Sequence, residues 1–244
     1  MTSTEAMIFQ LKNLKGKPLK QKLEHIFTYY WIPIMVIVVI LGVAVSYIVH
    51  LATMKDSGLT VTCINAYAER DQVEAYITEF AQQAKIDLDQ YEVRLSTDMT
   101  ILNDDLMNSY DTIQTLTAQI AGQTIDMIVS DPQTLSLYIY QDIFVDLTQV
   151  LDPEQQTEYE QHYLYMDIAF FKKIETLPEG SIEYPDPTKP ELMEQPVPVA
   201  LLLPENGEFQ QLCYPHKPDE VAVGILFNSQ NIDNAQAFLD YIMK

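Results

Sequence analysis

The hydrophobic positions of this 244-residue chain form one long unbroken run, followed by shorter patterned segments. No Asp, Glu, Lys or Arg occurs between Glu24 and Lys55, and the 22 residues 31–52 are almost all apolar. At about 1.5 Å of rise per residue, a helix of this length extends for about 33 Å, which is enough to cross the roughly 30 Å hydrocarbon core of a bilayer. The pattern predicts a transmembrane helix over residues 29–54 that contacts the lipid bilayer through residues 31–52.

The charges that flank this run predict its orientation. Residues 1–28 hold five Lys and two Glu, whereas Lys55 is the single basic residue just beyond the run. Because Lys and Arg gather on the cytoplasmic side, we expect a single-pass protein of the cell membrane, with its N-terminus in the cytoplasm and residues 55–244 outside. A cleaved signal peptide is the alternative, but its apolar region is typically only 7–15 residues long. We therefore expect an uncleaved signal anchor.

Beyond the run, the hydrophobic pattern alternates between two periods. Residues 59–67 are rich in β-branched side chains and predict a strand, whereas residues 73–84 carry the apolar stripe of an amphipathic helix. Residues 91–97 are apolar at every second position, which is typical of a half-buried strand. The helical period returns over residues 113–122, and residues 124–129 form a third apolar strand. This order predicts an α/β domain with a parallel or mixed sheet and helices on both faces.

The third predicted strand ends at a local helix-start signal, the sequence Ser130-Asp131-Pro132. An Asp side chain accepts hydrogen bonds from the unpaired N–H groups of a first helical turn. Proline suits the first helical position, because the N–H that it lacks would be unpaired there anyway. We therefore expect a helix from Pro132 to about Tyr140.

Two segments of this region resemble bacterial extracellular solute-binding proteins, the periplasmic-binding-like proteins of ABC transporters. Leu116 to Asp152, which begins LTAQIAGQTIDMIVSDP, resembles their first-lobe signature, and Val221 to Lys244 is similar to their late strand, loop and helix. The resemblance covers about half of the outer region. It implies a periplasmic-binding-like fold, in which two lobes close on a solute.

The chain departs from that family in the space available for a second lobe. Only residues 153–197 separate the two similar segments, whereas a second lobe usually needs well over a hundred residues. We therefore expect a reduced, membrane-anchored relative in which residues 153–197 are an insertion or a vestigial lobe. Within them, the pattern of residues 159–171 predicts a helix, and the Pro-rich residues 178–198 predict a surface loop.

Composition changes this picture mainly through charge. The chain has 14 Lys and Arg against 35 Asp and Glu, and residues 53–244 hold nine of the former and 33 of the latter. Such a surface repels a phosphate backbone, so nucleic acid is excluded as a partner. A solvated acidic coat is the simplest interpretation, and a site for cationic ligands is the alternative.

Candidate catalytic chemistry is sparse. The sequence has no HExxH, GxSxG, P-loop, GxGxxG or CxxC motif, and its four His residues lie far apart. Residues 103–111 are rich in carboxylates but lack the ligand order of an EF-hand, which favours a solvated turn over a calcium site. We expect no enzyme, no metal and no cofactor. Cys63 and Cys213 both lie in the outer region, where a disulfide is chemically permitted, and two buried free thiols are the alternative.

A binding site is expected where strand order reverses, beyond the carboxyl ends of the strands. The first and third predicted strands end at Asn65 to Tyr67 and at Ser130 to Asp131. Asn65, Ser130 and Asp131 could supply hydrogen bonds there, and the ring of Tyr67 could stack on a flat apolar face. Helix capping explains Asp131 without a ligand, and ordinary surface packing explains Tyr67 as well.

Two functions follow as hypotheses. The first is ligand capture or sensing at the cell surface by a membrane-anchored solute-binding-like protein, whose partner is a small solute of unknown identity. The second is a non-catalytic interaction or scaffold module of an envelope complex, in which the ligand cleft has been lost and the partner is a membrane or envelope protein.

Overall fold

The computed structural model describes residues 18–102, 105, 107–174, 184–215 and 220–244, and it consists of two units that meet between Met54 and Lys55. The described part of the first unit is essentially one helix, α2 (Leu19–Thr53). Within α2, Trp31–Val49 is long and apolar enough to cross a membrane, and the side chains of these residues are all exposed. The structure therefore has one apolar N-terminal helix suited to be a membrane span or a signal anchor.

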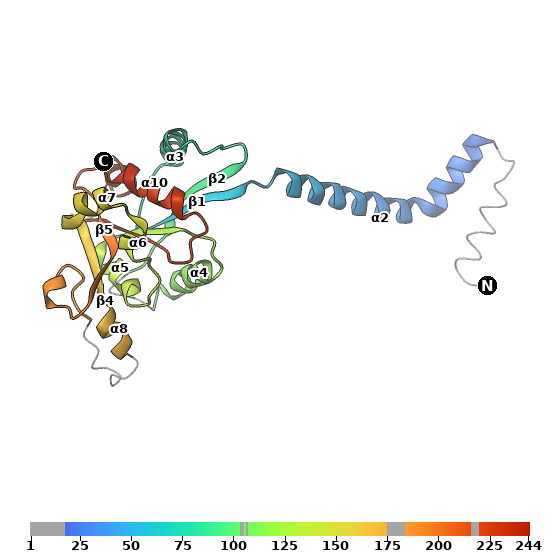
Figure 1. Cartoon of the computed structure of the whole chain (residues 1–244). Helices are drawn as coiled ribbons and strands as arrows, with labels where there is room; N and C mark the ends of the chain where they lie inside the picture. The colour runs from blue at the N-terminus through green and yellow to red at the C-terminus, as the bar shows by residue number, and fades with distance from the viewer. Residues whose placement is uncertain (1–17, 103–104, 106, 175–183, 216–219) are drawn as a thin grey trace. The chain divides into compact units, whose positions relative to one another are not determined.

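The second unit is built on a six-stranded mixed sheet (Figure 1). In chain order, its strands are β1 (Asp56–Ile64), β2 (Tyr91–Met99), β3 (Met127–Ser130), β4 (Tyr163–Asp167), β5 (Pro196–Leu202) and β6 (Ala222–Ile225). Their order across the sheet is β2-β1-β3-β6-β5-β4. β1 pairs in parallel with β2 and β3, while β6 pairs antiparallel with β3 and β5, and β4 pairs antiparallel with β5. The sheet edges are therefore β2 and β4.

Helices cover both faces of this sheet, as Figure 1 shows for α3 and α10 on one side and α4 and α5 on the other. The first face carries α3 (Arg70–Ala84), α6 (Leu147–Val150), α7 (Pro153–Glu158), α9 (Glu208–Cys213) and α10 (Ile232–Ile242). The second face carries α4 (Tyr110–Ala121), α5 (Pro132–Ile139) and α8 (Ile168–Ile174). Two 3₁₀ turns, Glu160–His162 and Pro190–Leu192, complete the described elements.

Each face of the sheet has its own hydrophobic core because side chains alternate along a strand. On β1, Leu59, Val61 and Cys63 belong to the core beneath α3 and α10, whereas Ile64 belongs to the core beneath α4 and α5. The predicted stripe of α3 is the face that is buried. The α/β class and the mixed sheet with helices on both faces are confirmed.

The prediction for residues 159–171 is wrong. This segment forms the turn Glu160–His162, then β4, then α8, rather than one helix. Leu164 and Met166 are buried two residues apart, so the strand period decides there, and β4 pairs with β5 about thirty residues further along the chain. The segment predicted as an insertion or vestigial lobe thus adds an edge strand to the same sheet.

The Pro-rich loop prediction fails at its end. Pro196 opens β5, where a strand tolerates a missing N–H, and Pro198 lies opposite an irregularity in the pairing with β4. Residues 175–183 of the same prediction lie outside the described residues.

Candidate functional site

The carboxyl ends of β1 and β3 bring three of the four predicted site residues together. Asn65 follows β1 in the left-handed conformation, with φ 59°. Its amide nitrogen donates to the carbonyl of Ile101 at 2.9 Å, and its amide oxygen accepts from the backbone N–H of Ile101 at 2.9 Å. Asn65 therefore fastens the segment that follows β2, and its nitrogen also lies 3.4 Å from Asp131 Oδ2.

Asp131 acts as the N-cap of α5, as the sequence predicts. Its Oδ1 accepts from the backbone N–H of Thr134 at 2.9 Å, and its Oδ2 accepts from the Thr134 hydroxyl at 2.7 Å. The fully buried Ser130 places its hydroxyl 3.4 Å from the same carboxylate. Burial alone raises the pKa of Asp131, but the donors from Thr134, Asn65 and Ser130 outweigh burial and hold the pKa below its ordinary value.

Tyr214 binds both strand ends through its hydroxyl, and no local signal in the sequence pointed to it. Its side chain is 4% exposed, and its hydroxyl lies 3.1 Å from the carbonyl of Ile64 and 3.0 Å from that of Val129, at the ends of β1 and β3. Burial raises the pKa of Tyr214 well above its ordinary value. A single neutral phenol thus joins the ends of β1 and β3.

Tyr67, the fourth predicted residue, points its ring elsewhere. Its backbone N–H donates to the carbonyl of Cys213 at 2.7 Å, while its side chain is 67% exposed. The polar atoms of Asn65, Ser130 and Asp131 are thus used on one another and on the backbone. The binding role of these residues remains a prediction, and the contacts that they make account for their presence without a ligand.

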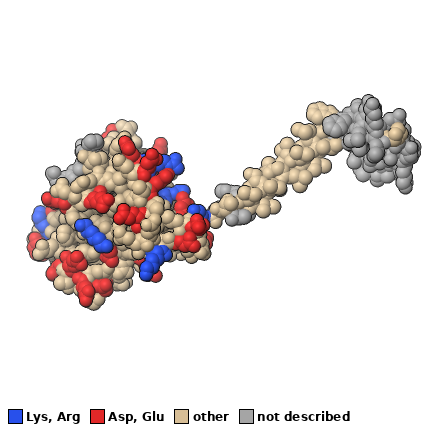
Figure 2. Space-filling view, turned by 90° about the horizontal axis from the view of Figure 1, so that it is seen from above, with Lys and Arg blue, Asp and Glu red and all other residues tan. Residues whose placement is uncertain are grey.

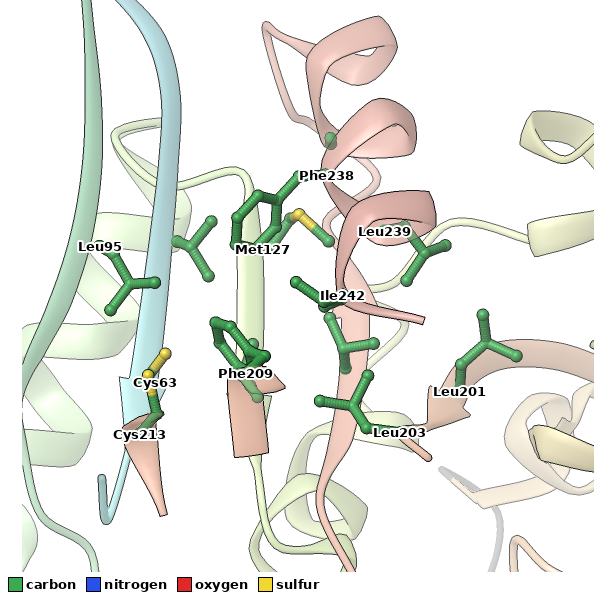
Figure 3. Close-up of a cluster of buried hydrophobic side chains, with 14 of the residues drawn as sticks. Cys63, Leu95, Met127, Leu201, Leu203, Phe209, Cys213, Phe238, Leu239 and Ile242 are labelled. Atoms are coloured by element: carbon green, nitrogen blue, oxygen red, sulfur yellow. The ribbon is translucent and has the colours of Figure 1, made fainter. Parts of the chain in front are cut away.

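Cys63 and Cys213 lie side by side in the hydrophobic cluster (Figure 3), from β1 and from the end of α9. Both are fully buried free thiols in the structure. Burial, followed by the contact with Cys213, raises the pKa of the Cys63 thiol well above its ordinary value, which disfavours a reactive thiolate. The disulfide between them remains a prediction.

A second candidate site lies along β2. A groove of about 990 Å³ follows this edge strand and is flanked by α3 and α4. On the α4 side its lining is polar, with the hydroxyls of Thr60, Thr62 and Ser96 from the sheet and Thr112 and Thr115 from the helix. Hydroxyl groups thus stand where a helix usually packs on a sheet through apolar side chains.

One acceptor in this groove has no partner. Gln119 of α4 lines the groove, and its Oε1 atom is buried without a hydrogen bond to any described residue. A buried acceptor without a partner costs free energy, so such an atom marks a place where a donor from outside the chain would be favourable. Hydrophobic periodicity could not reveal it, because Gln119 lies between apolar positions of an ordinary amphipathic helix.

The groove carries both signs of charge. Arg94 pairs with Glu92 on β2 at 3.1 Å, and Arg70 pairs with Glu74 on α3 at 2.9 Å. All four side chains are more than half exposed, so the pairs add little stability and leave the charges accessible. Elsewhere carboxylates predominate, as Figure 2 shows for the face of the α/β domain that it displays.

The two edges of the sheet differ in how they are covered. At β4, the N–H of Tyr165 donates to the carbonyl of Pro187 at 2.9 Å, so a returning segment covers that edge. At β2, the outward N–H of Tyr91 donates to the carbonyl of Asp87 at 2.8 Å, and beyond Tyr91 no backbone hydrogen bond to the outer edge occurs among the described residues. The open edge and the groove therefore coincide.

A metal centre finds no support in the described part of the chain, which has no cluster of three His, Cys, Asp or Glu residues suited to an ion. The carboxylate-rich residues 103–111 lie partly outside the described residues. Comparisons of the chain with protein-family models, with curated proteins and with solved structures found no match. The resemblance to solute-binding proteins therefore remains a prediction.

Proposed function

We propose that this chain is a membrane-anchored interaction module of the cell envelope, whose outer α/β domain binds a protein partner along β2 without catalysis. Of the two functions that the sequence suggests, this one agrees better with the geometry. The observation that carries it is the β2 edge, which is open beyond Tyr91 and lies beside the large groove. At the ends of β1 and β3, by contrast, the hydroxyl of Tyr214 already contacts the carbonyls of Ile64 and Val129.

The membrane part of the proposal rests on α2. Its apolar segment Trp31–Val49 meets the length and hydropathy required of a span, and its side chains are exposed. The Lys-rich segment before it and the acidic domain after it favour a cytoplasmic N-terminus and an outer domain.

The binding part rests on unused hydrogen-bonding capacity. An edge strand presents a row of backbone N–H and C=O groups that another chain can pair with. The groove beside β2 adds accessible charges from Glu92 and Arg94. At Asn65, Ser130 and Asp131, by contrast, the polar atoms already have partners within the chain.

In-cell photo-crosslinking tests this function. A photoreactive benzoylphenylalanine in place of Thr97, which lines the groove, should give a discrete protein adduct in membranes. The same group in place of Leu192, which is 75% exposed on the far side of the sheet, is the matched control and should give none. Equal labelling from both positions, or none from either, would count against the module.

A thermal-shift screen of the full chain in nanodiscs tests the rival function, solute capture. A specific ligand raises the unfolding midpoint by mass action. We expect no shift with sugars, amino acids or divalent ions. A concentration-dependent rise that Asn65→Ala abolishes would replace the interaction module with solute capture at the ends of β1 and β3.

A further inference from the structure

We propose that the β2 edge pairs with β2 of a second copy of this chain, antiparallel and centred on Val93, so that one sheet continues through two outer domains. The inference rests on the proposed function and deepens it, because it names the first partner of the β2 edge. Such a contact is isologous: both copies use the same strand, and a two-fold axis relates them.

The length and accessibility of the strand suit this pairing. β2 spans the nine residues Tyr91–Met99, and its neighbour within the chain, β1, occupies one edge only. On the open side, the groove leaves Glu92 and Arg94 exposed, and Val93 is half-buried against the α3 face. A second extended strand can therefore approach without displacing a described element.

The sequence of β2 is complementary to itself when read in the opposite direction. In an antiparallel pair, residues directly opposite lie on the same face with Cβ atoms about 4.5–5.5 Å apart. With Val93 at the centre, Glu92 lies opposite Arg94 of the second copy, and Tyr91 lies opposite its Leu95. Each charged side chain then meets one of opposite sign, and an aromatic ring meets an aliphatic one.

Neighbouring registers lose this match. A centre at Glu92 places two Glu side chains opposite each other, and a centre at Arg94 does the same with two Arg side chains. Like charges directly opposite are destabilising. When the same faces of the two sheets are aligned, the centre of the pairing can move only one residue at a time, to Glu92 or to Arg94. Of these three centres, the charges favour Val93.

Net charge sets the conditions under which the pairing forms. The nine basic and 33 acidic residues of residues 53–244 make two outer domains repel each other over long range. Salt screens that repulsion beyond about 8 Å at physiological ionic strength, and anchoring in one membrane raises the effective concentration of the second copy. We therefore expect pairing at membrane density that strengthens with moderate salt.

A cysteine placed at the centre of the contact provides the test. Val93→Cys brings two thiols together across the two-fold axis, whereas the native Cys63 and Cys213 are fully buried and out of reach. In membranes that contain the full chain, a short bismaleimide should link V93C into dimers at least five-fold more than L192C, the exposed control. Equal, low yields from the two variants would overturn the proposal.

Charge exchange tests the register separately. E92R or R94E alone should lower the V93C crosslink yield at least three-fold, because each places like charges opposite one another. The double variant E92R/R94E restores the opposite-sign pairing and should restore the yield. Glu92 and Arg94 are both exposed, so circular dichroism should show that the charge changes leave the folding of the V93C chain unchanged. A double variant that stays as poor as either single variant would contradict this register.

The two proposals fail in different ways. If benzoylphenylalanine at Thr97 captures another envelope protein while V93C gives no dimer, the interaction module stands and the second copy is wrong. If neither experiment gives an adduct, both proposals fall.

Discussion

The two edges of this sheet differ in coverage: the chain covers the β4 edge and leaves most of the β2 edge exposed. At β4, the segment that returns after α8 lays the carbonyl of Pro187 on the N–H of Tyr165, and the carboxylate of Asp167 fixes the crossing. At β2, the chain departs into α4, and beyond Tyr91, whose N–H donates to the carbonyl of Asp87, the described residues leave the outer edge uncovered. An uncovered strand invites pairing with other chains, and proteins usually blunt it.

The difference shows which edge the chain covers and which it leaves exposed. The cover of β4 is elaborate, because the rings of Tyr140, Phe170 and Tyr184 pack together beside it with centroid distances of 5.2–6.0 Å. At β2 the described residues blunt the edge with the charged pair Glu92 and Arg94, the exposed Asp98 and two irregularities in the pairing with β1, and no segment covers the strand beyond Tyr91. A covered edge and an open edge on one sheet are what a one-sided interaction module requires.

Removing the carboxylate of Asp167 should destabilise the covered β4 edge more than any other change considered. Asp167 is 6% exposed, and its two oxygens accept from the backbone N–H groups of Ala169, Phe170, Glu194 and Gln195. Asp167→Ala leaves these donors unpaired, so the outer domain should lose about 3 kcal/mol of unfolding free energy. Chemical denaturation followed by near-ultraviolet circular dichroism measures this. A loss indistinguishable from zero would mean that Asp167 does not hold the covered edge.

A milder change should uncover β4 without unfolding the domain. Tyr184 is 54% exposed, and its ring packs on Tyr140 and Phe170. Tyr184→Ala removes two aromatic contacts, which should cost about 1 kcal/mol and speed amide exchange at Tyr165. Hydrogen exchange with mass spectrometry reads that peptide directly. Unchanged exchange at Tyr165 would show that the aromatic cluster is not what holds the covering segment.

Acid pH should also destabilise the covered β4 edge, but less than Asp167→Ala or Tyr184→Ala. Burial raises the pKa of Asp167, but its backbone donors outweigh burial and hold the pKa below the ordinary value. The unfolded chain therefore takes up the proton first, so this stabilisation is complete above about pH 4 and is lost as the pH falls through the folded-state pKa. In Asp167→Asn, the unfolding midpoint should fall less steeply with decreasing pH below pH 4. Thermal melts at pH 3 to 7 measure this dependence. An equally steep acid loss in this variant would assign it to other carboxylates.

Local signals in the sequence predicted much of this structure. The Ser130-Asp131-Pro132 signal fixed the start of α5, and the spacing of apolar residues fixed the buried face of α3, because a cap and an amphipathic stripe depend on near neighbours. The helix prediction for residues 159–171 failed because their aromatic and aliphatic side chains fit both the helical and the strand period. Only the pairing of β4 with the distant β5 decides between them.

The candidate site divides in the same way. Strand order brings Asn65, Ser130 and Asp131 together as the sequence predicts, since the ends of β1 and β3 meet at one place in the sheet. The hydrogen bonds that occupy this site could not be predicted, because they join residues that are far apart in the sequence. Asn65 bonds to Ile101, and the hydroxyl of Tyr214 contacts Ile64 and Val129, which are 150 and 85 residues away. The openness of β2 is likewise a property of the assembled sheet.

Hydrogen exchange of the full chain, reconstituted in bilayers at low and at high protein density, tests the central claim most directly. The account predicts that the peptide containing Tyr165 is protected at both densities. The peptide containing Tyr91–Met99 should exchange faster at low density and become protected at high density. Protection of β2 that does not change with density, or exchange at Tyr165 as fast as in β2, would contradict it.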